Sequence, residues 1–307
     1  MVSMFANMIM KKMEVQKDFV FDMKNVDEFR KEFEKMFLKM KPAKGITLKE
    51  IQIGNIPAEK FSLNSEDTKS RVMLYLHGGG YFSGSYISHR RFVSILCKKL
   101  NLNAYSINYR LAPEDPYPAG LDDAFFTYKW LLEEKSIPAE RIIIMGDSSG
   151  GGLTLALLHR IGTQNLPQPK AAICLSPWTD LTLTSETMMT KIEEDVFFNM
   201  ENMKTSAKAY IHTESPENPE ISPIFADFNG FPPIFLQVGT REMLLNDSLI
   251  IAEKMKKQGV SVTLDVWEGM FHAFLIFSAI PMIGKLTPEF RKALKNVKNF
   301  VDGLSKD

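Results

Sequence analysis

The chain has 307 residues, which is enough for a large hydrophobic core in one or two domains. Its 37 basic and 37 acidic side chains balance to a net charge of zero, so the composition offers no electrostatic surface for nucleic acid or an anionic membrane. No apolar run approaches the length of a transmembrane helix, and the two cysteines, Cys97 and Cys174, fall in patterns of buried elements, which argues against a disulfide framework.

The N-terminus is apolar, but Lys11 and Lys12 follow the apolar residues instead of preceding them, and no small-residue cleavage site appears. This order is not that of a secretory signal, and we expect a cytoplasmic protein with no stable membrane insertion. Apolar residues then recur at helical spacing from Val26 to Met40 and predict an amphipathic helix. Such a helix either packs on the core or forms a lid over an apolar pocket, and the sequence does not distinguish the two.

Strands then alternate with helices along the chain. The expected strands span residues 48–57, 60–63, 71–76, 102–108, 141–145, 171–175, 234–238 and 260–267, and the expected helices 90–100, 121–135, 153–158, 247–258 and 289–304. This alternation predicts an α/β fold with a mainly parallel sheet covered by helices on both faces. Residues 183–231 break it with a helical pattern at 196–211 and a proline-rich run, and we interpret them as an insertion over the carboxyl edge of the sheet, where ligands bind in such folds.

The most informative stretch begins with the β-branched run at 141–145 and continues into Gly146-Asp147-Ser148-Ser149-Gly150. A buried strand, a G-x-S-x-G and a helix, in this order, are the context of a nucleophile elbow, where a serine lies on a tight strand-to-helix turn. Gly146 and Gly150 lack the Cβ atoms that would crowd the turn, and the helix N-terminus behind Ser148 favours negative charge. The alternative is an ordinary glycine-rich turn.

A nucleophilic serine needs a base, and the base needs an orienting acid. In folds with this elbow the acid and then the histidine follow the serine along the chain. Among five histidines only His272 lies in a loop after the last predicted strand. Glu242 lies in the loop after the strand at 234–238 and is the favoured acid. Asp247 lies further on, where it would cap or enter the next helix, and is the alternative.

An acyl-transfer site also needs N–H donors for the tetrahedral anion. The run His77-Gly78-Gly79-Gly80 ends a predicted strand with three residues that lack side chains, so its amides are free to turn toward an anion. Ser149 would add its own N–H. His77 is expected to brace this loop and not to act as the base. The glycines do not follow a phosphate-loop or dinucleotide pattern, and no Cys or His spacing is that of a metal site, so neither cofactor nor metal is implied.

These motifs resemble the hormone-sensitive-lipase-like branch of the α/β-hydrolases, also called bacterial family IV carboxylesterases. The resemblance covers roughly residue 45 onward and includes the segments 109–114, 176–181, 222–227 and 269–274. It implies the α/β-hydrolase fold, with a mainly parallel central sheet flanked by helices and a helical cap. The implied division is residues 1–45 as N-terminal cap helices, 46–182 and 216–307 as the catalytic domain, and 183–215 as a cap insertion.

The resemblance also implies roles for single residues. They are Ser148 as nucleophile, His272 as base, the amides of Gly79, Gly80 and Ser149 as oxyanion donors, and Asp147 as a brace of the site, with His77 and Gly78 in support. The chain departs from the family where Ser149 stands for the usual alanine, which leaves the backbone N–H in place, and where Glu242 stands for the usual aspartate. Two further departures, Asn108 and Asp115, do not touch the expected chemistry.

We therefore expect a serine carboxylesterase with a Ser-Glu-His triad that hydrolyses small, apolar, short- to medium-chain acyl esters through an acyl-enzyme on Ser148. The alternatives are an amide hydrolase or deacetylase with the same triad, and a non-enzymatic small-molecule receptor on the same fold. Because Ser148 and His272 are both present, the sequence favours an enzyme. The expected partner is a small ester and not nucleic acid, and an exposed last strand would provide the surface for a homodimer.

Overall fold

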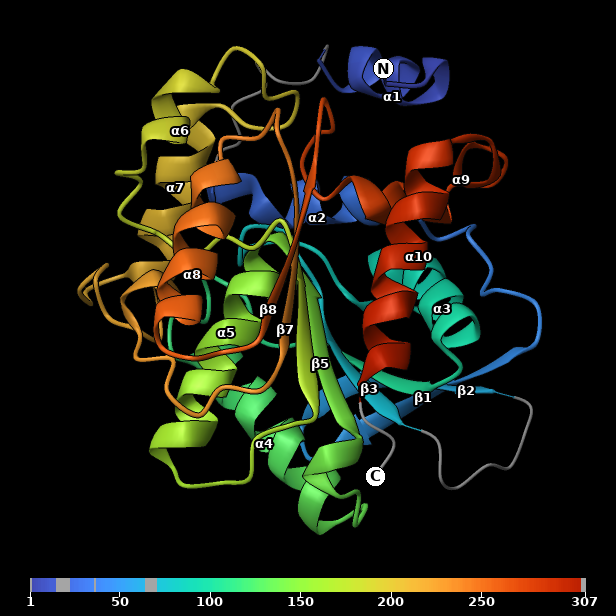
Figure 1. The fold of residues 1–307 in the computed structure, drawn as a ribbon, viewed down its shortest axis with the longest axis vertical. Coiled ribbons are helices and arrows are strands. Elements are labelled where there is room, and N and C mark those ends of the chain that lie inside the picture. The colour runs from blue at the N-terminus through green and yellow to red at the C-terminus, as the bar shows by residue number, and fades with distance from the viewer. Residues whose placement is uncertain (1, 15–22, 36, 64–70, 305–307) are drawn as a thin grey trace.

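The computed structural model describes residues 2–14, 23–35, 37–63 and 71–304, and its centre is one mixed sheet (Figure 1). In these residues the strands are β1 (Ile46–Ile53), β2 (Ile56–Leu63), β3 (Val72–Leu76), β4 (Asn103–Ile107), β5 (Ile142–Asp147), β6 (Ala171–Leu175), β7 (Ile234–Gly239) and β8 (Val262–Trp267). Their order is β1-β2-β4-β3-β5-β6-β7-β8, with β1 and β2 antiparallel to their neighbours and β3 to β8 mutually parallel. The predicted α/β architecture with a mainly parallel sheet is confirmed.

Helices cover both faces of this sheet. They are α3 (Tyr86–Leu100) and α10 (Pro288–Gly303) on one face, and α4 (Ala119–Glu133), α5 (Ser148–Thr163) and α8 (Leu245–Lys257) on the other (Figure 1). Each face buries its own hydrophobic cluster, because successive residues of a strand point to opposite sides. Leu74 and Ile144 lie in the cluster with α4, α5 and α8, whereas Met73 and Ile143 lie in the cluster with α3 and α10. Both cysteines are buried and free.

The remaining helices gather mainly at the carboxyl end of the parallel strands, at the top of Figure 1. They are α1 (Met4–Glu14), α2 (Val26–Lys35), α6 (Glu186–Thr190), α7 (Met200–Ile211) and the short α9 (Ile283–Leu286). Among the described residues, none of the helices combines the length and the apolar character needed to cross a membrane.

Several element ends differ from the sequence-based expectation, each for a local reason. The helix expected to reach Met40 ends at Lys35, with a turn at 37–39, and Met36 lies outside the described residues. Helix α3 begins at Tyr86 and not at 90, because Ser85 and Ser88 form a capping box. Helix α7 begins at Met200 and not at 196, because Asn199 caps it.

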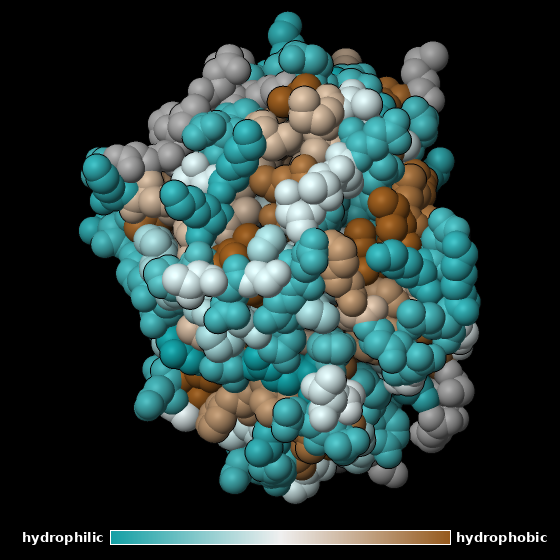
Figure 2. All heavy atoms as spheres, turned by 90° about the vertical axis from the view of Figure 1, so that its left-hand side faces the viewer, coloured by the Kyte–Doolittle hydropathy of each residue, from teal (hydrophilic) through white to brown (hydrophobic). Residues whose placement is uncertain are grey.

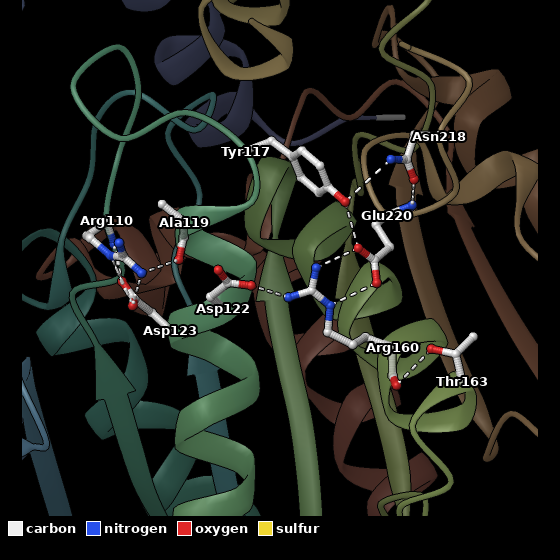
Figure 3. Close-up of polar contacts among 9 residues, drawn as sticks. All are labelled: Arg110, Tyr117, Ala119, Asp122, Asp123, Arg160, Thr163, Asn218 and Glu220. Carbon is white, nitrogen blue, oxygen red and sulfur yellow. Dashed lines mark hydrogen bonds and ion pairs between the residues drawn. The ribbon is translucent and has the colours of Figure 1, made fainter. Parts of the chain in front are cut away.

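Residues 183–215, which include α6 and α7, are called the insertion segment below. The chain that follows this segment is fixed to the body by an ionic network at Glu220 (Figure 3). Arg160 of α5 donates to Glu220 at 2.8 and 2.5 Å and to Asp122 of α4 at 2.5 Å, and Tyr117 donates to Glu220 at 2.7 Å. Burial alone would raise the pKa of Glu220, but the hydrogen bonds from the half-buried Arg160 guanidinium and from Tyr117 keep it below its usual range.

The face of the molecule that carries α6, α7 and α8 exposes apolar side chains only in separate areas between hydrophilic ones (Figure 2). Met189 of α6 is two-thirds exposed, whereas Met188, Val196 and Met203 of the insertion segment are buried. Scattered exposed apolar residues are ordinary on protein surfaces. Met188 and Met203 belong to the hydrophobic cluster that contains residues of α4, α5 and α8, and Val196 belongs to the other cluster, so the insertion segment packs on the core through these side chains.

Candidate active site

Ser148 lies where β5 ends and α5 begins. Its backbone has φ +53°, a left-handed conformation that few residues other than glycine adopt. The turn closes only because two neighbours lack side chains. A Cβ atom at Gly146 would lie 2.2 Å from the carbonyl oxygen of Gly150, and one at Gly150 would lie 2.1 Å from that of Leu76. The serine is thus held on a tight strand-to-helix turn, with only 7% of its surface exposed.

His272 and Glu242 form a buried pair in the loops that follow β8 and β7. His272 Nδ1 lies 2.8 Å from Glu242 Oε2. The other carboxylate oxygen of Glu242 accepts hydrogen bonds from the Gly239 amide at 2.5 Å and from Ser176 Oγ at 2.7 Å. Both oxygens are therefore occupied, and the ring orientation of His272 is fixed by a fully buried acid.

Asp247, the alternative acid, is directed elsewhere. It lies in the first turn of α8, and its Oδ2 accepts from the amides of Thr179 at 2.7 Å and Asp180 at 2.9 Å, in the loop after β6. Burial raises its pKa to about 7. The structure therefore places Glu242, and not Asp247, against His272.

The protonation of His272 depends on its acidic neighbours. Burial alone lowers the pKa of an imidazole, but the hydrogen bond and the charge of Glu242, with the charges of Asp195 and Asp147, outweigh burial and raise the pKa of His272 above 6.5. Its Nε2 is buried and has no hydrogen-bond partner in the part of the chain that the structure describes. His272, the candidate base, thus presents a free nitrogen and does not bond to Ser148 here; such bonds are often long in free enzymes.

The loop after β3 places three glycines beside the elbow. Gly79 and Gly80 have φ +127° and +64°, and their amides, with that of Ser149, have no acceptor within the described residues. Asp147 accepts from the Gly78 amide at 3.1 Å and from Tyr75 Oη at 2.6 Å, which ties this loop to the elbow. The arrangement leaves free N–H groups in the loop that Asp147, the residue before Ser148, holds to the elbow.

His77, which the sequence predicts to brace this loop, contacts Gly78 and Tyr109. Its Nδ1 lies 2.9 Å from the Gly78 carbonyl oxygen, and its ring stacks on Tyr109 with centroids 4.3 Å apart. Complete burial, with a smaller contribution from His89, lowers its pKa to about 3. His77 is therefore neutral near pH 7. His89, whose Nε2 lies 3.4 Å from Asp147 Oδ1, is a buried neighbour that the sequence did not single out.

Ser176 joins the separate parts of the site. Its Oγ donates to Glu242 and accepts from the amide of Ala273 at 3.0 Å, and its neighbour Trp178 donates its amide to the Ser148 carbonyl at 3.0 Å. Its φ of +46° is left-handed. The sequence assigned no role to Ser176, because its contacts come from residues up to 97 positions away. The unusual backbone conformation marks it only once the fold is known.

The segment before β1 also contacts the glycine loop. Arg30 of α2 donates to the carbonyl oxygens of Phe82 and Ala112, each at 2.7 Å, and binds the Glu114 carboxylate with both of its terminal nitrogens. Phe82 closes the turn that begins at Gly79, since its amide donates to the Gly79 carbonyl at 3.2 Å. Helix α2 therefore supports the loop that carries the candidate oxyanion donors.

The insertion segment covers the base with two aromatic rings. The ring centroids of Phe198 and Phe197 lie 4.6 and 6.1 Å from that of His272. Phe197 also packs against Phe271 and Phe277. A molecule that reaches Ser148 and His272 therefore meets apolar aromatic surface.

Comparison with known proteins agrees with this geometry. Residues 73–276 match the profile of a family described by the alpha/beta hydrolase fold. The chain is 33% identical to an esterase of Acinetobacter venetianus, covering 85% of this chain and 84% of that one, and 33% identical to an acetyl-hydrolase of Streptomyces hygroscopicus, covering 80% and 79%. It is also similar to the crystal structure of an esterase from the bacterial hormone-sensitive lipase family, with a TM-score of 0.89, 31% identity and 98% of both chains covered.

Proposed function

The chain belongs to the α/β-hydrolase family, in its hormone-sensitive-lipase branch, and we propose that it cleaves small, apolar acyl esters through an acyl-enzyme on Ser148. It is a carboxylic ester hydrolase by its similarity to esterases over more than four fifths of its length. The observation that carries the mechanism is Ser148 in a left-handed conformation at the elbow after β5, together with the buried His272–Glu242 pair in the loops after β8 and β7 of the same parallel sheet.

The proposed reaction begins when Ser148 Oγ attacks the ester carbonyl and His272 Nε2 takes the hydroxyl proton. Glu242 keeps the ring in place and stabilises the imidazolium that forms. The amides of Gly79, Gly80 and Ser149 donate to the oxyanion, each contributing on the order of 3 kcal/mol.

The tetrahedral intermediate collapses with loss of the alcohol, which receives the proton from His272 and leaves the acyl group on Ser148. Water then gives up a proton to His272 and attacks the acyl-enzyme, and the acid departs as the serine proton returns. Each step uses the free Nε2 of His272, which is the nitrogen that Glu242 does not occupy.

A small acyl group is supported by the surroundings of the base. Ser148 is only 7% exposed and the ring of Phe198 lies against His272, so a substrate that reaches the serine finds little open surface and an aromatic side chain. One relative is named an acetyl-hydrolase, and the structure of EstE5 (TM-score 0.88, 32% identity, 97% and 98% coverage) was determined after soaking with p-nitrophenyl butyrate. Both acyl groups are short.

Hydrolysis of p-nitrophenyl esters of increasing acyl length tests the proposal. The wild type is compared with Ser148→Ala and with Ser106→Ala. Ser106 lies in β4, and its buried hydroxyl has no hydrogen-bond partner among the described residues. We expect turnover to peak at a short chain, to vanish in Ser148→Ala and to persist in Ser106→Ala. A matched p-nitroanilide hydrolysed as fast as the ester would favour the amidase alternative. Equal turnover by all three proteins would refute Ser148 as the nucleophile.

A further inference from the structure

Asp195 is a buried carboxylate of the insertion segment, between α6 and α7. It is 1% exposed. Its Oδ1 accepts from the amides of Phe197 at 2.8 Å and Phe198 at 3.1 Å, and its Oδ2 accepts from the amide of Met243 at 2.8 Å. One side chain therefore closes a turn of the insertion segment and attaches it to the loop after β7.

That loop carries Glu242, and the insertion segment holds it by a second contact. Thr187 Oγ1 donates to the Met243 carbonyl at 2.7 Å and accepts from the Asn246 amide at 3.1 Å. Both main-chain polar groups of Met243 are thus bonded to the insertion segment. Since Met243 directly follows Glu242, these contacts fix the backbone from which Glu242 reaches His272.

The same turn aims the aromatic rings at the base. Phe197 and Phe198, whose amides Asp195 holds, are the two residues whose rings contact His272. Asp195 therefore hydrogen-bonds both to the backbone that carries the two rings beside His272 and to the loop that carries Glu242. A substitution at Asp195 should therefore affect His272 in two ways, through the position of the two rings and through the position of Glu242.

Three acidic groups act on His272 from different elements: Glu242 after β7, Asp195 in the insertion segment and Asp147 at the end of β5. Each favours the imidazolium. The charges of His272 and Glu242 act in turn on Asp195. Burial raises the pKa of Asp195, while the charge of His272 and the amides of Met243 and Phe197 favour its ionised form.

We propose that Asp195 is a positioning residue of the insertion segment, which fixes the loop that carries Glu242 and adds a second negative charge to the surroundings of His272. The inference rests on the proposed function, because it concerns the same base. It gives the insertion segment a part in proton transfer besides covering the site. It predicts that this segment influences the pH profile of the reaction.

The test is the pH profile of kcat/KM for p-nitrophenyl acetate with Asp195→Asn, which keeps the size of the side chain and removes its charge. We expect the acid limb to move to lower pH by roughly 0.5 to 1 unit, because the imidazolium loses a favourable charge. The plateau of kcat/KM should fall by about tenfold, because one contact to Met243 is lost. The position of the limb does not depend on the amount of folded enzyme, so partial misfolding does not imitate this shift.

Two matched variants separate charge from attachment. Thr187→Val removes the second contact to Met243 without changing charge, and should lower the plateau while leaving the limb in place. Glu220→Gln removes a negative charge from the chain that follows the insertion segment, beside Arg160 (Figure 3), and should also leave the limb in place. Asp195→Ser, which lacks the charge but keeps a short acceptor, should reproduce the shift if Asp195→Asn is obtained in too low a yield.

The inference would be overturned if the acid limbs of Asp195→Asn and Asp195→Ser coincided with that of the wild type. The proposed function would remain intact in that case. If the wild type itself showed no acid limb, or if Ser148→Ala retained turnover, the proposed function would fail instead. A shift of equal size in Glu220→Gln would also overturn the inference, since the effect would then come from net charge alone.

Discussion

Ser176 offers the most direct test of how the site is held together. Replacing it with alanine removes a hydrogen bond to the charged Glu242, which contributes about 1.5–3 kcal/mol, and leaves the buried Ala273 amide without an acceptor, which costs about 1–3 kcal/mol. We expect the free energy of unfolding to fall by about 3 kcal/mol or more. Glu242 keeps its bonds to Gly239 and His272, so kcat/KM should fall only about tenfold, equivalent to ~1.4 kcal/mol.

The matched variant is Ser176→Gly, which loses the same hydroxyl but tolerates the φ of +46°. It should be about 1 kcal/mol more stable than Ser176→Ala, because alanine pays for the left-handed conformation and glycine does not. Urea denaturation monitored by fluorescence gives the stabilities, and p-nitrophenyl acetate hydrolysis gives the activities. If Ser176→Ala equalled the wild type in both measurements, the role of Ser176 in holding Glu242 would be refuted.

Three further predictions concern titratable groups. Activity should fall on acidification with an apparent pKa above 6.5, because the acidic neighbours of His272 outweigh its burial; a flat kcat/KM profile from pH 5 to 8 would contradict the assignment of the base. Glu242→Gln should lower kcat by roughly 10³-fold or more in single-turnover and steady-state assays, while Asp247→Asn should leave kcat within a few-fold of the wild type; the reverse order would exchange their roles. Because the pKa of Asp247 is about 7 in the folded chain and 3.8 when unperturbed, the unfolded chain loses this proton first as pH rises. Between pH 4 and 7 this group should therefore lower stability by at most about 4 kcal/mol, and Asp247→Asn should remove that decline in denaturation measured across this range.

The sequence predicts the central strands well because β3, β5, β6 and β7 are short, mainly apolar runs that are buried at every residue. Strand β6 has the expected bounds, and β5 and β7 extend beyond theirs only at the carboxyl end. Helix ends were less predictable where the cap is unusual. Ser85 forms a capping box with Ser88 in place of the common glutamate, so the first turn of α3 was not expected.

The sequence also indicated which residues the loops would bring together, because strand ends in a parallel sheet meet at one edge. Ser148, Glu242 and His272 follow β5, β7 and β8, and their positions could be inferred from that rule. Ser176 and Asp195 could not, because they act through hydrogen bonds to backbone or carboxylate groups 48 to 97 positions away. No residue spacing marks such contacts.

The contact between the insertion segment and Met243 requires specific side chains on one side only. Met243 contributes only its amide and carbonyl, which every residue except proline possesses, whereas Asp195 and Thr187 contribute specific side chains. Position 243 can therefore change to other apolar residues that fit its buried site, whereas positions 187 and 195 must keep side chains that form these hydrogen bonds. A chimera that receives this segment from a relative needs hydrogen-bonding side chains at both positions, whatever residue it carries at 243.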